Sequence, residues 1–274
     1  MSGKLYVVGT PIGNLSDFSP RAKETLAAVD FIAAEDTRVT LKLLNRFGIK
    51  KPMVSYHEHN KAASGKGIID RLLAGETAAL VTDAGMPAIS DPGEDLVRLC
   101  HEQGIAVESV PGPSALITAL AISGMPSGRF CFEGFLTTNK TGRREHLQQV
   151  AAWPCTLIFY EAPHKLLSTL KSMYEVFGNR QIALVRELTK IHEQVMRTTL
   201  QEAVAHFEQT PPKGEFVLIV APPEEVALEP QPLEDAVSMA RRLQKQGLSA
   251  SAAAKEAAAA TGYKKSEIYK AISE

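Results

Sequence analysis

Short apolar runs alternate with longer amphipathic stretches along the first 124 residues of the chain. Such runs are typical of buried strands, and the stretches between them are typical of helices that cover a sheet. The pattern predicts strands at 5–8, 31–34, around Val54, 77–81 and 105–110. It predicts helices at 20–29, 40–47, a stretch ending at Leu73, 94–103 and 115–123. Because strand and helix alternate, we expect a mainly parallel sheet with covering helices.

A second α/β unit follows the first. Its pattern predicts strands at 129–136, 156–160, 182–185 and 216–220, with helices ending near Phe177 and covering 200–208. A polar loop after the first of these strands carries Lys140, Arg143 and Arg144. This small basic cluster has two open interpretations, a phosphate contact or a solvated surface.

The end of the chain has a different composition. Residues 221–232 contain four prolines and three glutamates, which predicts a linker. Beyond it we expect helices at 233–246, between Ser249 and Gly262, and at 264–272, in a helix-turn-helix-like arrangement. Nucleic-acid binding and a docking or dimer role both remain open for this module. The expected domains are 1–124 and 125–222, both α/β, and a helical module at 230–274.

One loop, residues 82–93, is unusually rich in glycine, proline and aspartate. Asp83 and Asp91 stand among two glycines and two prolines, directly after the predicted strand 77–81. Rigid loops at the carboxyl ends of parallel strands are where open α/β sheets bind ligands. The other interpretation is an ordinary tight turn with Ser90 or Asp91 as a helix cap. Neighbouring predicted strands end in similar loops, so their convergence favours a ligand site.

Composition narrows the function classes. The chain has 274 residues, 45% of them hydrophobic, and a net charge of −1, which argues against a globally basic nucleic-acid binder. The sequence shows no apolar run of membrane-spanning length and no signal peptide, so we expect a cytoplasmic protein. Cys100, Cys131 and Cys155 fit neither a disulfide framework nor a zinc spacing.

Two further local patterns are weak. The loop 9–14 has glycines four residues apart but lacks the dinucleotide fingerprint and a Gly-Lys-Ser/Thr ending. His57 and His59 lie two residues apart without an evident third ligand, so polar site lining or capping is favoured over metal binding. We expect no metal.

Taken in order, eight short motifs resemble those of the ribosomal RNA small-subunit methyltransferase I family, along nearly the whole chain. That family belongs to the tetrapyrrole-methylase-like class of S-adenosylmethionine (SAM) enzymes. The motifs are 8–15 (VGTPIGNL), 34–38 (AEDTR), 57–60 (HEHN), 83–93 (DAGMPAISDPG), 111–115 (PGPSA), 159–164 (FYEAPH), 186–190 (RELTK) and 213–215 (KGE). The family usually has threonine where Met86 stands. Tetrapyrrole methylases typically have Gly-Asp-Pro where this chain has 85–87 (GMP), which disfavours a porphyrin-like substrate.

The resemblance implies two α/β domains of the tetrapyrrole-methylase type with SAM in the cleft between them, commonly in a homodimer. It implies SAM-dependent 2′-O-methylation of a cytidine in the decoding region of small-subunit ribosomal RNA. The cofactor-binding residues that it implies are Gly9, Pro11, Asp83, Gly85, Met86, Ile89, Ser114, Ala115, Tyr160 and Glu215.

The expected chemistry needs a general base, because a ribose hydroxyl is a poor nucleophile at neutral pH. Asp36 and Glu187 are the preferred bases, ahead of Glu35, Glu133 and Glu161, and this places the chemistry across the cleft from the loop 82–93. Arg38 and Arg186 complete the expected catalytic set, although Asp36–Arg38 and Arg186–Glu187 could equally be structural ion pairs. The expected RNA contacts are Lys140, Arg143, Arg144, Lys190, Lys264, Lys265 and Lys270.

Two rival functions remain open at this point. One is a SAM-dependent methylase of a tetrapyrrole-like small molecule or of a protein side chain. The other is a non-catalytic SAM-binding regulator in which the acidic loop residues only support folding.

Overall fold

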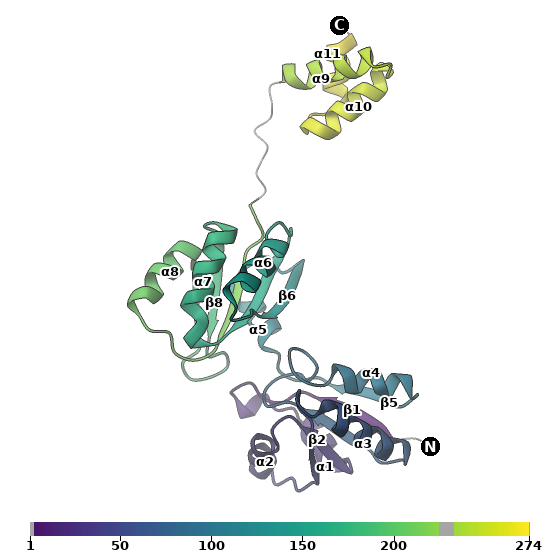
Figure 1. Ribbon diagram of the computed structural model, residues 1–274, viewed down its shortest axis with the longest axis vertical. Coiled ribbons are helices and arrows are strands. Elements are labelled where there is room, and N and C mark those ends of the chain that lie inside the picture. The colour runs from purple at the N-terminus through teal and green to yellow at the C-terminus, as the bar shows by residue number, and fades with distance from the viewer. Residues whose placement is uncertain (1–2, 225–232, 274) are drawn as a thin grey trace. The chain divides into compact units, whose positions relative to one another are not determined.

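The structure, a computed structural model, describes residues 3–224 and 233–273. The chain forms two compact units, residues 1–223 and residues 224–274 (Figure 1). Of the predicted linker at 221–232, residues 225–232 lie outside the described residues. No helix of the described ranges is both long and apolar enough to cross a membrane.

The first sheet is wholly parallel, as the alternation of strand and helix predicted. Its strand order is β3-β2-β4-β1-β5. The strands are β1 (Lys4–Val8), β2 (Phe31–Ala34), β3 (Met53–Ser55), β4 (Ala78–Val81) and β5 (Ala106–Val110). The helices of this half are α1 (Pro20–Ala28), α2 (Thr37–Arg46), α3 (Lys61–Leu73) and α4 (Glu94–Glu102), preceded by the short 3-10 turn η1 (Leu15–Asp17).

Both faces of the sheet are buried at β2 and β4, because these strands are apolar at consecutive positions rather than at alternate ones. On one face, Ile32 and Val81 pack with Leu26 of α1 and Leu44 of α2. On the other face, Leu80 and its neighbours pack with side chains of α3 and α4. The ends of these two strands are therefore where a ligand can reach them.

The second sheet is mixed, with strand order β6-β7-β10-β8-β9. β6 and β7 are parallel, whereas β10 runs antiparallel to both β7 and β8, and β9 antiparallel to β8. The strands are β6 (Phe130–Phe135), β7 (Thr156–Glu161), β8 (Gln181–Arg186), β9 (Gln194–Thr199) and β10 (Phe216–Val220). The helices are α5 (Ala115–Ser123), α6 (Lys140–Val150), α7 (Pro163–Phe177) and α8 (Leu200–Gln209).

Helix α5 links the two sheets physically. Leu116 and Leu120 of α5 pack against Ile158, Val185 and Ile219 of the second sheet, while α6, α7 and α8 cover its opposite face. The domain boundary expected at residue 124 stays a prediction, but the helix just before it buries its apolar side on the second sheet. The loop that opens α5 is thereby held between the two halves.

Three local predictions of the sequence were wrong. The polar loop expected around Lys140 is helix α6, which Asn139 caps by accepting hydrogen bonds from the backbone N–H groups of Thr141 and Gly142. Helix α2 begins at Thr37 rather than residue 40, because Asp36 is its N-cap. Strand β9 was not expected. It is an edge strand with polar side chains on both faces, so no apolar run in the sequence indicates it.

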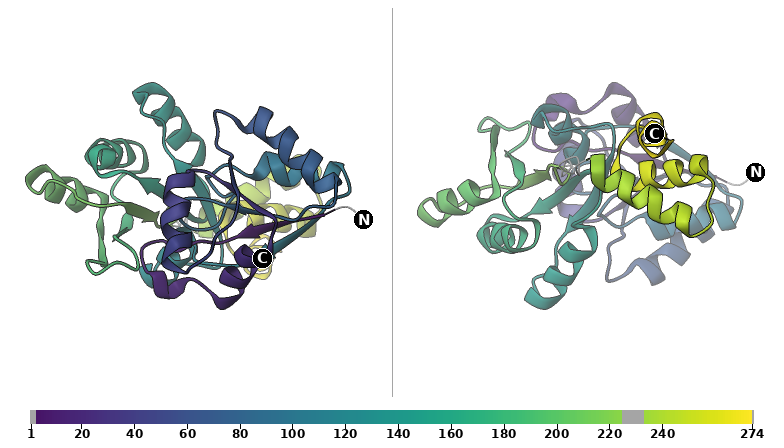
Figure 2. Two further views of the ribbon diagram at one scale, coloured as in Figure 1. Left: turned by 90° about the horizontal axis from the view of Figure 1, so that it is seen from below. Right: turned by 90° about the horizontal axis from the view of Figure 1, so that it is seen from above.

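The second unit contains the three predicted helices, α9 (Leu233–Lys245), α10 (Ala250–Thr261) and α11 (Lys265–Ser273). They pack around a small core of Ala236, Ala240, Ala253, Ala257 and Ile268, and Figure 2 shows them as one bundle. Gly262, with φ of 78°, makes the left-handed turn between α10 and α11. The predicted fold class, two α/β parts with a helical C-terminal module, is confirmed.

Candidate functional site

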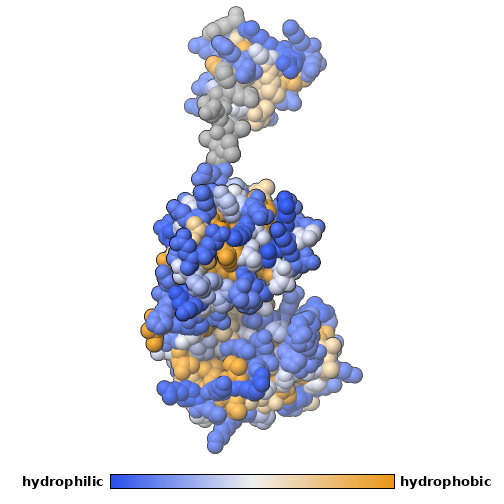
Figure 3. Space-filling model, turned by 60° about the vertical axis from the view of Figure 1, so that its left-hand side comes forward, coloured by the Kyte–Doolittle hydropathy of each residue, from blue (hydrophilic) through white to orange (hydrophobic). Residues whose placement is uncertain are grey.

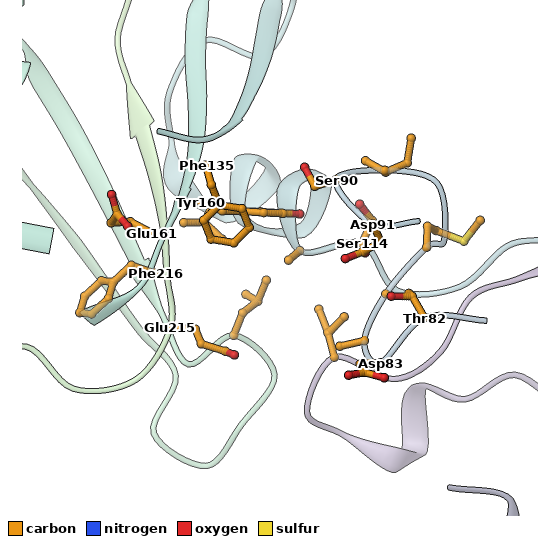
Figure 4. A pocket seen from close by; sticks show the side chains of 18 of the residues that line it. Thr82, Asp83, Ser90, Asp91, Ser114, Phe135, Tyr160, Glu161, Glu215 and Phe216 are labelled. Carbon is orange, nitrogen blue, oxygen red and sulfur yellow. The ribbon is translucent and has the colours of Figure 1, made fainter. Parts of the chain in front are cut away.

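The loops that follow the parallel strands converge on one cavity of about 380 Å³ in the first unit (Figure 4). One wall comes from the loops of the first sheet and from the residues just before and at the start of α5, and the other comes from the ends of β6, β7, β8 and β10 and the residues next to them. The first wall consists of Ile12, Glu35, Thr82, Asp83, Ala84, Gly85, Met86, Ile89, Ser90, Asp91, Ser114 and Ala115. The second consists of Phe135, Tyr160, Glu161, Ala162, Val185, Leu188, Glu215, Phe216 and Val217. The predicted convergence of loops at a ligand-sized cavity is therefore observed.

The floor of the cavity depends on close backbone contacts that only glycine permits. A Cβ atom on Gly9 would lie 2.7 Å from Gly112 Cα and 2.7 Å from Met86 Sδ. Thr10 and Gly85 form an isolated antiparallel bridge, with Thr10 N–H donating to Gly85 O at 2.9 Å and Gly85 N–H donating to Thr10 O at 3.2 Å. These contacts fix the backbone of three loops as one rigid edge.

Residues 82–93, which we call the central loop, hold an unusual backbone conformation. Gly85 and Gly93 have φ of 92° and 146°, and the non-glycine residues Ala88 and Ser90 have φ of 66° and 64°. Positive φ costs a non-glycine residue about 1–3 kcal/mol and persists where the surrounding structure enforces it, often at functional sites. The central loop is thus a strained, fixed element rather than an ordinary turn.

Three carboxylates, Glu35, Asp83 and Asp91, gather beside Thr82 on the first wall. Glu35 Oε2 accepts hydrogen bonds from the Thr82 hydroxyl and, at 3.3 Å, from the Asp83 N–H. Burial, together with the negative charge of Glu35, raises the pKa of Asp91 to about 6 and also raises the pKa of Asp83. The side of the cavity that the central loop forms is therefore acidic and partly protonatable near neutral pH.

The facing wall is aromatic and neutral around Tyr160. The Tyr160 hydroxyl accepts a hydrogen bond of 3.0 Å from the Leu116 N–H, and burial raises the pKa of Tyr160 to about 12. Phe132 and Phe135 pack edge-on against its ring, with centroids 4.9 and 5.5 Å away. Figure 4 shows Tyr160 facing the side of the cavity where Ser90, Asp91 and Ser114 lie.

Most of the cofactor-binding residues expected from sequence are brought together here. Those that line the cavity are Asp83, Gly85, Met86, Ile89, Ser114, Ala115, Tyr160 and Glu215. Gly9 and Pro11 do not line it, although Gly9 supports Met86 from behind. Thr82, Ser90 and Phe135 line the cavity and were not singled out, because nothing distinguishes a lining residue from its sequence neighbours until the loop direction is known.

The four residues expected to be catalytic lie outside the cavity lining. Asp36 forms a 2.6 Å ion pair with Arg38, whose side chain is 86% exposed, and this pairing holds the pKa of Asp36 well below its usual range. Arg186 Nε donates to Lys213 O at 2.6 Å. Asp36 thus pairs with Arg38, whereas the partner of Arg186 is a backbone carbonyl.

Glu187 belongs to a compact ion-pair network. Its Oε1 lies 3.1 Å from Lys190 Nζ and accepts a 3.2 Å hydrogen bond from Glu215 N–H, and the hydrogen bond with Lys190 lowers the pKa of Glu187. Lys190 also pairs with the Glu215 carboxylate at 3.1 Å. A Cβ on Gly13 would lie 2.6 Å from Lys190 Cγ, so this network packs against the loop after β1.

The residues expected to contact RNA divide by exposure. Lys140 and Arg144 are exposed on α6, and Lys264 and Lys265 are exposed in the second unit. Arg143 is only 7% exposed, and its Nε donates to Ser172 Oγ at 3.0 Å. Because helix α6 turns Arg143 toward α7, the expectation that this side chain is available to RNA was wrong.

Comparison with known proteins agrees with this architecture. Residues 4–204 match the model of the Tetrapyrrole (Corrin/Porphyrin) Methylases family. The Ribosomal RNA small subunit methyltransferase I of Synechocystis sp. is 47% identical over 271 residues, which cover 97% of this chain and 96% of the relative. The chain belongs to the ribosomal RNA small subunit methyltransferase I family. The resemblance and the expectation of a methyltransferase are thereby confirmed.

Other members and solved structures extend the comparison. The small subunit methyltransferase I of Halalkalibacterium halodurans is 54% identical over 218 residues, covering 80% of this chain and 75% of the relative. A solved uroporphyrin-III C-methyltransferase from Thermus thermophilus, complexed with S-adenosyl homocysteine, is 20% identical with a TM-score of 0.57, covering 80% of this chain and 97% of that chain. A diphthine synthase structure is 13% identical with a TM-score of 0.61, and the match covers 81% of this chain and 90% of that chain. These structures share the fold of the methyltransferase I family.

Proposed function

We propose that the chain transfers a methyl group from SAM to the ribose 2′-hydroxyl of a cytidine in the decoding region of small-subunit ribosomal RNA. The observation that carries this proposal is the full-length identity to relatives named for that ribosomal RNA, at 47% over 97% of the chain. The cavity supports it, because the motifs that mark the family in the sequence supply most of its lining.

The residues of the cavity fit SAM. The volume of about 380 Å³ lies within the range of small-molecule sites, and most of the lining is apolar or backbone. The ammonium and sulfonium charges of SAM suit a wall that contains Asp83 and Asp91. Glycine at position 9 lets the loop after β1 approach Gly112 and Met86 closely enough to form the floor. We propose that the eight expected residues in the lining hold SAM, with Gly9 and Pro11 shaping the loop behind them.

Methyl transfer places two demands on the protein. When bound, SAM supplies an electrophilic methyl group whose carbon–sulfur electron pair remains on sulfur. The protein has to align the acceptor hydroxyl with the methyl group and remove the hydroxyl proton. Removal of the proton by a general base alone contributes about 10²–10⁴-fold to the rate. A carboxylate of the cavity wall is better placed for this than Asp36 or Glu187, because those two are ion-paired outside the lining with lowered pKa values.

RNA binding needs exposed cations, because phosphate contacts supply most of the affinity. We propose Lys140 and Arg144 of α6 as contacts in the first unit, and Lys264, Lys265 and Lys270 in the second. Removing residues 230–274 should then leave SAM affinity unchanged, since the cavity lies within the first unit, and should lower methylation of small subunits. Unchanged RNA methylation after this truncation would contradict a role for the second unit.

A homodimer and a cytoplasmic location are part of the same proposal. Several large apolar side chains are exposed in the first unit, among them Phe130, Phe135 and Trp153, at 40%, 57% and 40%. Figure 3 shows apolar patches on the face that it presents. Such patches are typical of protein–protein contact surfaces, and sedimentation of the purified protein measures whether they join two copies.

The proposed function is tested by methyl transfer from SAM labelled in its methyl group. Small ribosomal subunits lacking the modification, protein-free ribosomal RNA and a tetrapyrrole are offered separately as acceptors. The expected result is label in small subunits or their RNA, recovered as 2′-O-methylcytidine after digestion. Label on the tetrapyrrole, on a base or on no acceptor would contradict the proposal.

A further inference from the structure

A second hollow, of about 490 Å³, lies on the α8 side of the second sheet, and we call it the basic hollow. Along β8, Val185 lines the cavity of about 380 Å³ described above, the main cavity, whereas Leu184 and Arg186 line the basic hollow. Successive side chains of a strand point to opposite faces, so the sheet separates the two spaces. Phe216, at the start of β10, borders both. The two spaces therefore share an edge that the strand ends form.

The lining of the basic hollow is cationic. Arg186, His206 and Lys213 belong to it, and its lining residues include no aspartate or glutamate. Within residues 3–224 and 233–273, none of these three side chains forms an ion pair. Like the net charge of the chain, most of its cationic surface is balanced by nearby acids, so an unbalanced group of basic side chains attracts an anionic ligand.

The acids close to the basic hollow in the sequence are paired with other cations. Glu187 and Glu215 each lie 3.1 Å from the Lys190 ammonium nitrogen. Glu208 of α8 pairs with Lys171 at 2.7 Å. Because each of these carboxylates has its own partner, the positive charge of the basic hollow is left for a ligand.

Arg186 is oriented by neutral acceptors rather than by a carboxylate. Its Nε donates to the Lys213 backbone oxygen at 2.6 Å, and its Nη1 donates to Gln194 Oε1 at 3.4 Å. These acceptors fix the guanidinium without cancelling its charge. The Glu187 N–H donates to Glu215 O at 3.1 Å, and the Glu215 N–H donates to Glu187 Oε1 at 3.2 Å. The strand ends that carry the two cations are thus held together before a ligand binds, which lowers the cost of ordering them.

The remaining lining and the position of the basic hollow indicate the kind of anion. Part of its surface is apolar, with Met196 and with Phe207, whose ring lies 5.8 Å from that of Phe216. Cations beside an aromatic surface suit a nucleotide of a single strand better than a bare phosphate ion. Lys213 lines the basic hollow and Glu215, two positions later, lines the main cavity, so their Cα atoms lie within about 7 Å. A polymer with regularly spaced phosphates can therefore reach both spaces at once.

We propose that the basic hollow binds a backbone phosphate of the RNA strand that carries the acceptor nucleotide, with Arg186 and Lys213 on the phosphate oxygens and His206 donating a further hydrogen bond. This inference rests on the proposed function. The acceptor ribose lies at the main cavity, and a neighbouring nucleotide of the same strand lies across the strand ends. The contact positions the strand and reads no base, because every nucleotide carries the same phosphate. Arg186 is thus a positioning residue for the substrate and not a catalytic one.

Lys213→Ala tests the phosphate contact, because it removes a positive charge and keeps the backbone oxygen that accepts the Arg186 hydrogen bond. Affinity for a short fluorescent single-stranded RNA should fall about three- to tenfold, and the slope of log affinity against log salt concentration should decrease in size by about 0.7. The matched control is Lys66→Ala, which removes an exposed lysine of α3. Calorimetry should give both variants the SAM affinity of wild type. An RNA affinity and salt slope equal to those of the control would overturn the contact.

Arg186→Lys tests the geometry of the contact, because it keeps the charge and loses the planar fork. Half-maximal single-turnover methylation should need about three- to tenfold more small subunits, with the maximal rate within about threefold of wild type and the salt slope unchanged. A lower maximal rate at an unchanged half-maximal concentration would place Arg186 in the chemical step and overturn its positioning role. If this variant does not fold, Lys213→Ala decides alone.

Competitors and a second substrate identify the occupant of the basic hollow. Inorganic phosphate and cytidine 5′-monophosphate should displace the fluorescent RNA only in large excess over it. Displacement by either at the concentration of the RNA would show a site for a free anion and contradict the proposal. A loss of small-subunit binding by Lys213→Ala, with unchanged binding of protein-free RNA, would assign the basic hollow to a ribosomal protein instead.

The phosphate contact and the proposed function can fail separately. Methylation of small subunits by wild type, with Lys213→Ala and Arg186→Lys behaving like the control, would overturn the contact and leave the proposed function standing. RNA binding that depends on Lys213, with no label recovered on a ribose, would overturn the proposed function and leave the contact. Absence of RNA and small-subunit binding by wild type would overturn both.

Discussion

The central loop and the loop after β8, residues 187–193, both contribute to the main cavity, and both are strained. Ala88 and Ser90 have positive φ in the central loop, as Glu187 and Thr189 have in the other. Their charges differ. In the central loop, acids lie beside acids and burial raises the pKa of Asp91, whereas Lys190 lowers the pKa of Glu187. Strain alone therefore does not distinguish the two loops; the electrostatic environment of their acids does.

The largest difference is expected between Gly93 of the central loop and Gly13 of the loop after β1, which packs against Lys190 of the loop after β8. A Cβ on Gly93 would meet Leu80 Cδ2 at 2.8 Å and the Ala88 backbone N at 3.1 Å, and neither the core nor the loop can move easily. Gly93→Ala should lower the free energy of unfolding by about 2–4 kcal/mol. Gly13→Ala meets mainly the flexible Lys190 side chain and should cost about 1–2 kcal/mol. Urea unfolding measures the free energy of unfolding of both variants. Equal losses in the two variants would contradict the expected difference between the two positions.

Replacing the acids Asp91 and Glu187 should change the free energy of unfolding by smaller amounts, and the two changes should have opposite signs. The pKa of Asp91 is raised on folding, so its charge destabilises the fold above the ordinary aspartate pKa, fully so above about pH 6. Asp91→Asn should raise the free energy of unfolding by about 1–2 kcal/mol at pH 8 and leave it unchanged near pH 3. Glu187→Gln should lower it by about 1 kcal/mol at pH 8. Two variants that shift stability in the same direction would remove the electrostatic distinction between the loops.

The smallest expected effect is the loss of stability when the Lys190 side chain is removed, and this loss should depend on pH. The pKa of Glu187 is lowered on folding, so the pair stabilises the protein above the ordinary glutamate pKa, and this stabilisation is lost as pH falls through the folded value. Lys190→Ala should therefore cost about 0.5–1 kcal/mol at pH 7, because the pair is partly exposed. Unfolding at pH 7 and pH 3 measures this, and a cost that persists at pH 3 would show that packing rather than charge is lost.

Much of this fold could be predicted from the sequence, because apolar strands separated by amphipathic helices leave a clear pattern. The convergence of the loops after β1, β2, β4 and β5 follows from parallel topology alone. The edge strand β9 and the capped start of α6 were missed, since their signals are a polar strand and a single asparagine.

The electrostatic environment of the acids could not be predicted in the same way. Asp36 and Glu187 were the bases preferred from the sequence, with structural ion pairs to nearby arginines as the open alternative. In the fold these acids form ion pairs, Asp36 with Arg38 and Glu187 with Lys190. The basicity of Asp91 depends on burial and on Glu35, 56 positions away along the chain. The proximity of two residues so far apart along the chain leaves no signal in the sequence around either of them.

The pH dependence of the single-turnover rate tests most directly the proposal that a carboxylate of the cavity wall, rather than Glu187, takes the proton of the acceptor hydroxyl. With SAM and small subunits saturating, the wild-type and Glu187→Gln rates should both fall as pH decreases through about 6, because Asp91 becomes protonated. The residual rate of Asp91→Asn should not show that decrease. A decrease retained in Asp91→Asn and abolished in Glu187→Gln would contradict the account and place the base in the loop after β8.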